Sequence, residues 1–144
     1  MVSKSMNSYK RALTIATDVH RHQVDLSGKP YITHPLYVAD HVKGNQERIV
    51  AILHDTIEDG GITIDYLKKF FTDDICDAVD VLTRKKGVPY LDYIKLVKKN
   101  KLAKAVKIVD LEHNMQVNRL DRLTMKDIAR LKKYIIAYKE LTSE

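Results

Sequence analysis

The sequence predicts a single all-α domain over residues 1–144, with about eight helices. Apolar residues recur at helical spacing along most of the chain, whereas alternating patterns are short and lack hairpin turns. The five glycines and three prolines fall in clusters that mark breaks between helices. A composition of 44% hydrophobic and 31% charged residues is ordinary for one folded domain, so global disorder is not expected.

Four helices are predicted in the first half of the chain, each delimited by residues that start or stop helices. They cover about residues 7–24, 35–42, 49–60 and 63–71. The first begins at Asn7 or Ser8 as N-cap, and the second has Pro35 in its first turn. The glycine pair 60–61 ends the third helix, and Thr63 caps the fourth.

Four more helices are predicted in the second half. They cover about residues 73–82, 89–97, 102–115 and 124–141. Asp73 or Asp74 starts the first of these, and Pro89 opens the next. The third is apolar over most of its length and should lie buried. The last begins at Thr124 and carries apolar residues at helical spacing, including Ile135.

The charge is distributed unevenly along the chain. The net charge is +6, but residues 54–80 carry −6 and residues 84–107 carry +8. The acidic segment could surround a cation and the basic segment could attract phosphate, although solvated helix faces of this composition are common. No apolar run approaches the about 18–20 residues of a membrane span, and residues 1–7 lack the apolar stretch of a signal peptide. A cytoplasmic protein without membrane partners is therefore expected.

The string His54-Asp55-Thr56-Ile57-Glu58-Asp59 is the most informative in the sequence. On one continuous helix it would place Glu58 one turn after His54, and Asp59 one turn after Asp55. Carboxylates that emerge directly from an apolar run repel one another and lose solvation, and a bound cation removes that cost. A solvated acidic helix end is the alternative.

Two further residues strengthen the hypothesis of a cation site. His34 lies between a turn and a helix start, and Asp110 lies inside an otherwise apolar helical stretch. Either one alone is more typical of a satisfied polar group in a core. With His54 and Asp55 they supply two imidazoles and two carboxylates, a set that suits Mn²⁺ or Fe²⁺, with Zn²⁺ as the alternative. Because Cys76 is the single cysteine, a thiolate-based zinc site is not expected.

Five motifs follow one another in an order and spacing that are specific. They are His20 with Gln23, Gly28-x-Pro30-Tyr31-Ile32-x-His34-Pro35, His54-Asp55-x-x-Glu58-Asp59, Val81-Leu82-Thr83, and Val106-Lys107-Ile108-Val109-Asp110-x-x-x-Asn114-Met115. Over residues 9–138 the chain resembles the HD superfamily of metal-dependent phosphohydrolases. More narrowly, it resembles the small stand-alone alarmone hydrolases related to the hydrolase domain of RelA/SpoT-type enzymes.

The resemblance implies an activity and assigns roles to ten residues. The implied reaction is Mn²⁺-dependent hydrolysis of the 3′-pyrophosphate of guanosine tetra- or pentaphosphate (ppGpp or pppGpp) by metal-activated water. The implied metal ligands are His34, His54, Asp55 and Asp110, and the residues that assist water activation are Glu58 and Asp59. The implied substrate contacts are Lys86, Asn114, Arg130 and Tyr134. No role is assigned to His22, His41 and His113, which are expected to be surface or partly buried polar groups, and Cys76 is expected in the core.

One departure from the family concerns recognition of the base. The family usually has a basic residue that packs on guanine where this chain has Asp25-Leu26, and an aspartate cannot make that stacking contact. Either Arg21, Lys29 or another group compensates, or the substrate is another nucleotide, such as a deoxynucleotide or a phosphorylated dinucleotide cofactor. A basic helical nucleic-acid-binding domain is a more distant alternative, because it leaves the histidine and aspartate pattern unexplained.

Overall fold

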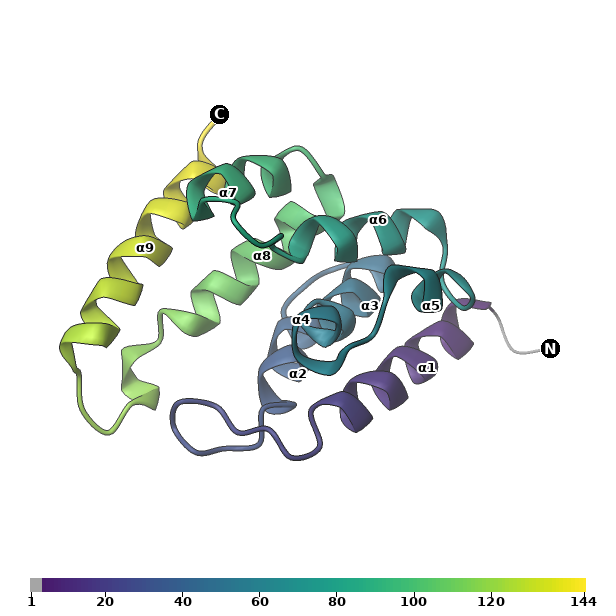
Figure 1. Ribbon diagram of the computed structural model, residues 1–144, viewed down its shortest axis with the longest axis horizontal. Helices are drawn as coiled ribbons and strands as arrows, with labels where there is room; N and C mark the ends of the chain where they lie inside the picture. Colours follow the sequence, from purple (N-terminus) through teal and green to yellow (C-terminus); the bar gives the residue numbers. More distant parts are fainter. Residues whose placement is uncertain (1–3) are drawn as a thin grey trace.

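The computed structural model describes the backbone of residues 4–144 and the side chains from residue 8 onward. Over this range the chain forms nine α-helices and one short 3₁₀ helix (Figure 1). Its extended pairing is limited to one antiparallel bridge, between Val24 and Pro30. The predicted all-α fold class is confirmed. Within the described residues, no helix combines the length and the apolar character needed to cross a bilayer.

The helices follow one another through short connections. They are α1 (Lys4–Val19), α2 (Thr33–Asp40), α3 (Asn45–Leu53), α4 (Thr56–Gly60), α5 (Ile64–Lys68), α6 (Asp73–Leu82), α7 (Tyr90–Lys98), α8 (Lys101–Asn114), the 3₁₀ helix η1 (Val117–Arg119) and α9 (Met125–Thr142). Several predicted helix starts hold. Thr63 and Thr124 accept hydrogen bonds from backbone N–H groups as N-caps, and Pro89 precedes α7.

The first helix ends at Val19 and not near Val24, because the chain after it turns back on itself. The backbone of Asp25 pairs with that of Lys29, and the amide of Tyr31 donates to the carbonyl of Gln23. Gly28 supplies the left-handed backbone, with φ of 83°, that this reversal requires. Turn chemistry therefore outweighs helical propensity here, and it produces the segment 23–31, which we call the 23–31 loop.

Helix α3 lies at the centre of the fold and positions the functional residues that follow it. All residues from Ile49 to Leu53 are buried, and α3 packs against α1, α2, α6 and α8. Helix α8 in turn packs against α9, which stands along one side of the molecule with α7 (Figure 1). The C-terminal ends of α3 and α8 therefore belong to the same packed group of helices.

The predicted apolar stripe of the last helix faces inward at Leu141, which is buried, and at Ile128 and Leu131, which are partly buried, but not at Ile135. Ile135, predicted on the apolar stripe, is 45% exposed, and its neighbour Ile136 is 58% exposed. Ala137 is also buried, on the side that α9 turns towards α7 and α8.

Gly60 marks a close approach of α4 to α1. A Cβ atom at this position would lie against Cγ1 and within 2.7 Å of Cγ2 of Val19. We therefore expect Gly60→Ala to lower the free energy of unfolding by about 1–3 kcal/mol, measured by urea denaturation. Adding Val19→Ala should recover part of the loss, because it removes the two methyl groups.

A matched control exists at Gly44, where an added Cβ would have no neighbour nearer than 3.8 Å. Gly44→Ala should therefore leave the packing between helices unchanged. Equal stability of the Gly60→Ala and wild-type proteins would show that α4 can move away from α1 without cost.

Candidate active site

Three of the four predicted metal ligands form one buried cluster. His34 comes from α2, His54 follows the last residue of α3, and Asp110 lies in α8. One ligand atom from each lies within 4.8 Å of the other two. Nε2 of His34 is 2.7 Å from Oδ1 of Asp110, and Nε2 of His54 is 3.6 Å from the same oxygen. The fold thus brings together side chains that are up to 76 positions apart.

The fourth predicted ligand, Asp55, lies at the edge of this cluster. Its Oδ2 is 3.1 Å from Nε2 of His54 and also accepts a hydrogen bond from the hydroxyl of Tyr31. Burial and the charge of Asp55 raise the pKa of Tyr31, so the phenol remains a proton donor to this carboxylate. Tyr31 therefore holds Asp55 beside the imidazole of His54.

The predicted continuous helix through His54 and Asp59 is wrong, because the chain breaks between α3 and α4. Nδ1 of His54 lies 2.5 Å from the carbonyl oxygen of Ala51, and Oγ1 of Thr56 donates to the carbonyl of Leu53 at 2.8 Å. These are the carbonyls that the amides of residues 55 and 57 would use in an uninterrupted helix. Side-chain hydrogen bonds compete with the helix here, and the break turns both His54 and Asp55 inward.

His54 is arranged as an electron-pair donor. Since Nδ1 donates its hydrogen to Ala51, the neutral ring carries its lone pair on Nε2. That nitrogen is buried, has no hydrogen-bond partner among the described residues, and faces oxygens of Asp55 and Asp110. Lone pairs that face one another in a buried place are stable only around a positive charge, either a proton or a metal ion. The cluster therefore fits a divalent cation.

The pKa values of the cluster show the same demand for positive charge. Burial by itself would lower the pKa of His54, but Asp55 and Asp110 hold it well above its ordinary value. Burial by itself would raise the pKa of Asp110, but Lys107 and the two histidines hold it well below its ordinary value. The carboxylate remains ionised and available to a cation.

Lys107 and Asn114 fix the Asp110 carboxylate from two sides. The Nζ atom of Lys107 lies 2.8 Å from Oδ2, whereas the two imidazoles face Oδ1. Nδ2 of Asn114 donates to Oδ1 at 3.1 Å. The ammonium group thus neutralises the outer oxygen and leaves the inner oxygen directed at the histidines.

The two predicted catalytic carboxylates point to different parts of the fold. Oε1 of Glu58 accepts the backbone N–H of Arg84 at 2.9 Å, and burial, reinforced by Asp55, raises the pKa of Glu58. Oδ2 of Asp59 accepts from Nε2 of Gln23 at 3.2 Å and lies 4.0 Å from Nδ1 of His20. A raised pKa favours Glu58 as a group that takes up a proton.

His113 was expected to be a surface or partly buried polar group, but the structure buries it. Its side chain is buried, its Nδ1 lies 2.7 Å from Nδ1 of His34, and its ring stacks on His34 and Tyr37. Burial, together with the positive charges of His34 and Arg119, lowers the pKa of His113 to about 4. A neutral His113 can accept a hydrogen from His34, which leaves Nε2 of His34 free to act as a ligand. The signal was its spacing, because His113 follows Asp110 by three residues on one helix face.

The other unassigned residues behave as predicted. His22 and His41 are exposed, and Cys76 is fully buried in the core.

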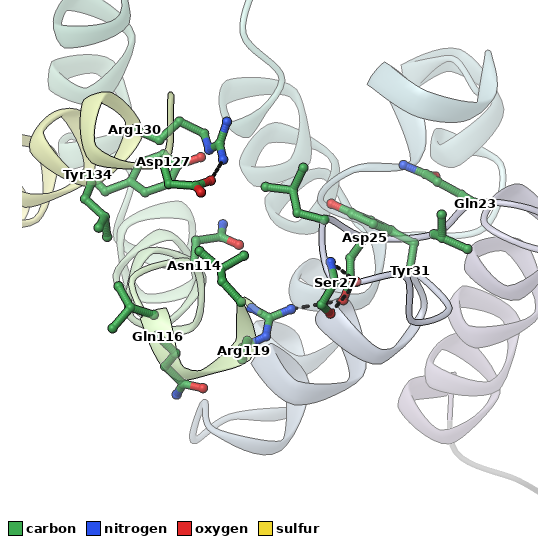
Figure 2. A pocket seen from close by; sticks show the side chains of 15 residues that line it. Gln23, Asp25, Ser27, Tyr31, Asn114, Gln116, Arg119, Asp127, Arg130 and Tyr134 are labelled. Carbon is green, nitrogen blue, oxygen red and sulfur yellow. Dashed lines mark hydrogen bonds and ion pairs between the residues drawn. The ribbon is translucent and has the colours of Figure 1, made fainter. Parts of the chain in front are cut away.

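Two cavities flank the cluster. The larger has a volume of about 370 Å³ and lies between the 23–31 loop and the segment from the end of α8 to α9 (Figure 2). Three predicted substrate contacts line it, namely Asn114, Arg130 and Tyr134. The smaller has a volume of about 170 Å³ and is lined by His54, Asp55, Glu58, Leu82, Arg84, Tyr90, Tyr93 and Lys107. Lys86, the remaining predicted contact, is exposed and lines neither cavity.

Asp25 has a structural partner that the sequence did not reveal. Its Oδ1 accepts from the amides of Ser27 and Lys29 at 2.9 and 3.0 Å and from the hydroxyl of Ser27, and its Oδ2 accepts from Arg119 at 3.1 Å. Although burial alone would raise the pKa of Asp25, these contacts lower it. Arg119 also donates to the carbonyl of His113, and Figure 2 shows it reaching from η1 to the 23–31 loop. The cations that line this cavity include Arg119 and Arg130, whereas Arg21 and Lys29 do not line it.

The Asp25–Arg119 pair should contribute measurably to stability. Both side chains are largely buried, with exposed fractions of 9% and 22%. A double-mutant cycle with Asp25→Ala and Arg119→Ala, measured by urea unfolding, should give a coupling free energy of about 1 kcal/mol. Additive effects of the two substitutions would show that solvent screens this pair completely.

The comparisons identify the family. The family described as HD domain matches residues 12–131. The chain therefore belongs to the HD domain family, and the resemblance seen in the sequence is confirmed. Membership in this family implies that the chain binds a divalent metal, in agreement with the donor set of the cluster.

Two relatives show which kinds of protein the chain is similar to in sequence. The chain is 30% identical over 128 residues to the probable GTP pyrophosphokinase of Mycobacterium leprae, and this match covers 80% of the chain and 16% of the relative. It is 39% identical over 85 residues to the guanosine-3′,5′-bis(diphosphate) 3′-pyrophosphohydrolase of Haemophilus influenzae, covering 56% of the chain and 12% of the relative. The chain thus spans less than a fifth of the length of either relative.

A solved structure shares the fold. It is described as a metazoan ortholog of SpoT that hydrolyzes ppGpp, and it superposes with a TM-score of 0.74 at 21% sequence identity. The match covers 93% of this chain and 84% of the other. The helical arrangement that surrounds the cluster is therefore shared over nearly the whole chain.

Proposed function

We propose that this chain hydrolyses the 3′-pyrophosphate of guanosine tetra- or pentaphosphate. The observation that carries the proposal is the buried cluster of two imidazoles and a carboxylate, with Asp55 at its edge, placed between two cavities. The relatives named as 3′-pyrophosphohydrolases of guanosine-3′,5′-bis(diphosphate), and the ppGpp-hydrolysing ortholog of SpoT that shares the fold, support this substrate.

The proposed metal ligands are His34, His54, Asp55 and Asp110. Their mixture of nitrogen and oxygen donors, without a thiolate, favours Mn²⁺, with Fe²⁺ and Zn²⁺ as the other candidates. A divalent cation held there would lower the pKa of a bound water towards neutrality and polarise a phosphoryl oxygen.

The protein groups then have distinct roles in the proposed reaction. Water attacks the phosphorus attached to O3′, the P–O3′ bond breaks, and O3′ takes a proton. The products are pyrophosphate and a nucleotide with a free 3′-hydroxyl. Glu58, whose pKa is raised by burial, accepts the proton of the attacking water. Asp59 accepts a hydrogen bond from the side chain of Gln23 and so anchors the start of the 23–31 loop.

The larger cavity is the proposed place of the nucleoside. At about 370 Å³ it falls in the range of about 300–1,000 Å³ typical of small-molecule sites. Asn114, Arg130 and Tyr134 line it and are the proposed substrate contacts. Lys86 lies on the exposed connection between α6 and α7, so its proposed role is limited to attracting phosphate from solution.

A second candidate keeps the reaction and changes the nucleotide. It is favoured by the Asp25–Arg119 pair, which occupies the wall where the family usually places a basic residue on the loop itself. A deoxynucleotide or a phosphorylated dinucleotide cofactor is then the alternative substrate.

One experiment tests both candidates. Protein freed of metal by chelation is reloaded with Mn²⁺, Fe²⁺ or Zn²⁺ and incubated with ppGpp, pppGpp, deoxynucleotides and a phosphorylated dinucleotide cofactor, and the products are separated by anion-exchange chromatography. We expect guanosine diphosphate and pyrophosphate from ppGpp, with the highest rate in Mn²⁺. Hydrolysis of another panel member alone would select the second candidate, and equal activity without metal would overturn both.

A further inference from the structure

We propose that the smaller cavity is an anion subsite that receives a diphosphate group. Its binding groups are Arg84 and the hydroxyl of Tyr90, which line the cavity, and Lys133, which lies against the ring of Tyr90 beside it. The inference rests on the proposed function for the origin of the diphosphate, which is the 3′-substituent of the substrate and then the pyrophosphate product. The binding groups themselves lie outside the candidate metal ligands and the nucleoside cavity.

Among the described residues, two cations that meet at Tyr90 have no acidic partner, namely Arg84, which lines the cavity, and Lys133, which lies beside it. The guanidinium of Arg84 donates from Nε to the carbonyl of Val88 at 2.8 Å, and within the described residues no carboxylate pairs with it. Lys133, from α9, likewise has no carboxylate partner in that part of the chain. Both lie against the ring of Tyr90, with centroid distances of 5.5 Å for Arg84 and 4.2 Å for Lys133. Cations that converge without an acidic partner are typical of a place that receives an anion.

The surroundings of Lys133 confirm that positive charge is concentrated there. Burial and the charges of Arg84, Lys107 and Arg130 together lower the pKa of Lys133. Among these cations, Lys107 forms an ion pair with Asp110, which belongs to the buried cluster of candidate metal ligands. An anion between Arg84 and Lys133 would relieve the repulsion that remains.

The hydroxyl of Tyr90 is an unused donor in the same place. It is buried and has no hydrogen-bond partner among the described residues, whereas the neighbouring hydroxyl of Tyr93 donates to the carbonyl of Leu82 at 2.6 Å. Buried polar groups in native proteins are normally paired, so an unpaired donor in a cavity indicates a missing acceptor. A phosphate oxygen is such an acceptor, and cations beside the ring favour it.

The two cavities differ in volume, and we assign a different part of the substrate to each. About 170 Å³ is below the range of about 300–1,000 Å³ for whole small molecules, but it suits a group of a few atoms. His54 and Asp55 line this cavity, while Asn114, which bonds Asp110, and Tyr31, which bonds Asp55, line the larger one. A phosphorus held at the cluster would therefore have its nucleoside on one side and its outer phosphate on the other.

The test uses inorganic pyrophosphate as the probe and the full chain without metal, so that binding is measured apart from catalysis. Isothermal titration calorimetry compares wild type with Arg84→Ala, Lys133→Ala and Tyr90→Phe. The matched control is Lys132→Ala, which removes the same charge from the same helix at an exposed residue that makes no ion pair or ring contact in the described part of the chain. Charge-assisted bonds predict a loss of affinity of about 5–10-fold for each cation variant and about 3–5-fold for Tyr90→Phe.

The outcomes separate the subsite from the proposed function. Pyrophosphate binding that weakens in these three variants and not in Lys132→Ala supports the subsite, even if no nucleotide is hydrolysed. No binding to the wild type, or equal binding by all variants, overturns it, even if ppGpp is hydrolysed. Circular dichroism checks that each variant is folded. If Arg84→Ala unfolds, Lys133→Ala and Tyr90→Phe decide the outcome, because Lys133 is exposed and Tyr90→Phe removes a single oxygen atom.

Discussion

Replacing Asp55 by alanine should abolish turnover and weaken metal binding while the protein stays folded. Asp55 lies 3.1 Å from Nε2 of His54 and supplies the fourth donor of the candidate set. Loss of Lewis-acid stabilisation amounts to several kcal/mol, so we expect kcat/KM to fall by about 10³-fold or more. The measurements are the metal content after dialysis, the rate of ppGpp hydrolysis and the circular dichroism spectrum.

Asp55 is a better target than Asp110 for this purpose. Asp110 is fully enclosed, and removing it would leave the ammonium of Lys107 without its carboxylate, a change that destabilises by about 3–5 kcal/mol when the pair is buried. Asp65→Ala is the matched control, since Asp65 is an exposed acid in α5 that lines neither of the two cavities beside the cluster. Activity that survives Asp55→Ala would show that the proposed centre is wrong.

Glu58→Gln should lower kcat by about 10²–10⁴-fold without changing metal affinity, because the amide cannot accept the proton of water. The substitution preserves the acceptor for the backbone N–H of Arg84, so the connection after α6 keeps its contact. Single-turnover kinetics with metal-loaded protein would separate this loss from any change in substrate binding.

The pH dependence of the hydrolysis rate tests the role of Glu58 independently. A base works in its ionised form, so the rate of the wild type should fall as the pH drops below the pKa of Glu58, which burial has raised. In Glu58→Gln that acidic limb should disappear. Asp59→Asn serves as the comparison, because Asp59 bonds Gln23 and not the Arg84 amide. A Glu58→Gln enzyme within threefold of the wild type would remove Glu58 from the reaction.

Patterns that depend on residue type and spacing were readable from the sequence. The fold class followed from helical periodicity. Asp110 stood out because it interrupts an apolar helix and His54 because it follows an apolar run, and the family resemblance joined His34 to them as a ligand. The helix break at His54 was not readable, because it depends on two side chains that take carbonyls from the helix backbone. Propensity gives no measure of that competition.

Contacts between distant segments were also beyond the sequence. The Asp25–Arg119 pair joins residues 94 positions apart, and neither residue lies in a pattern that marks it. The burial of His113 depends on the packing of α2 against α8, which sets its ring between His34 and Tyr37. Such pairings become visible only when tertiary structure fixes which surfaces meet.

The distribution of the cluster over three helices has a consequence for folding. His34, His54 and Asp110 come from α2, the end of α3 and α8, so a cation held by all three would act as a cross-link between early and late parts of the chain. An ion that binds only the native state stabilises it by mass action, by about 4 kcal/mol at a free concentration of 1,000 times Kd. The melting temperature would then depend on the free concentration of the metal. In a cell short of that metal, the protein would be less stable as well as less active.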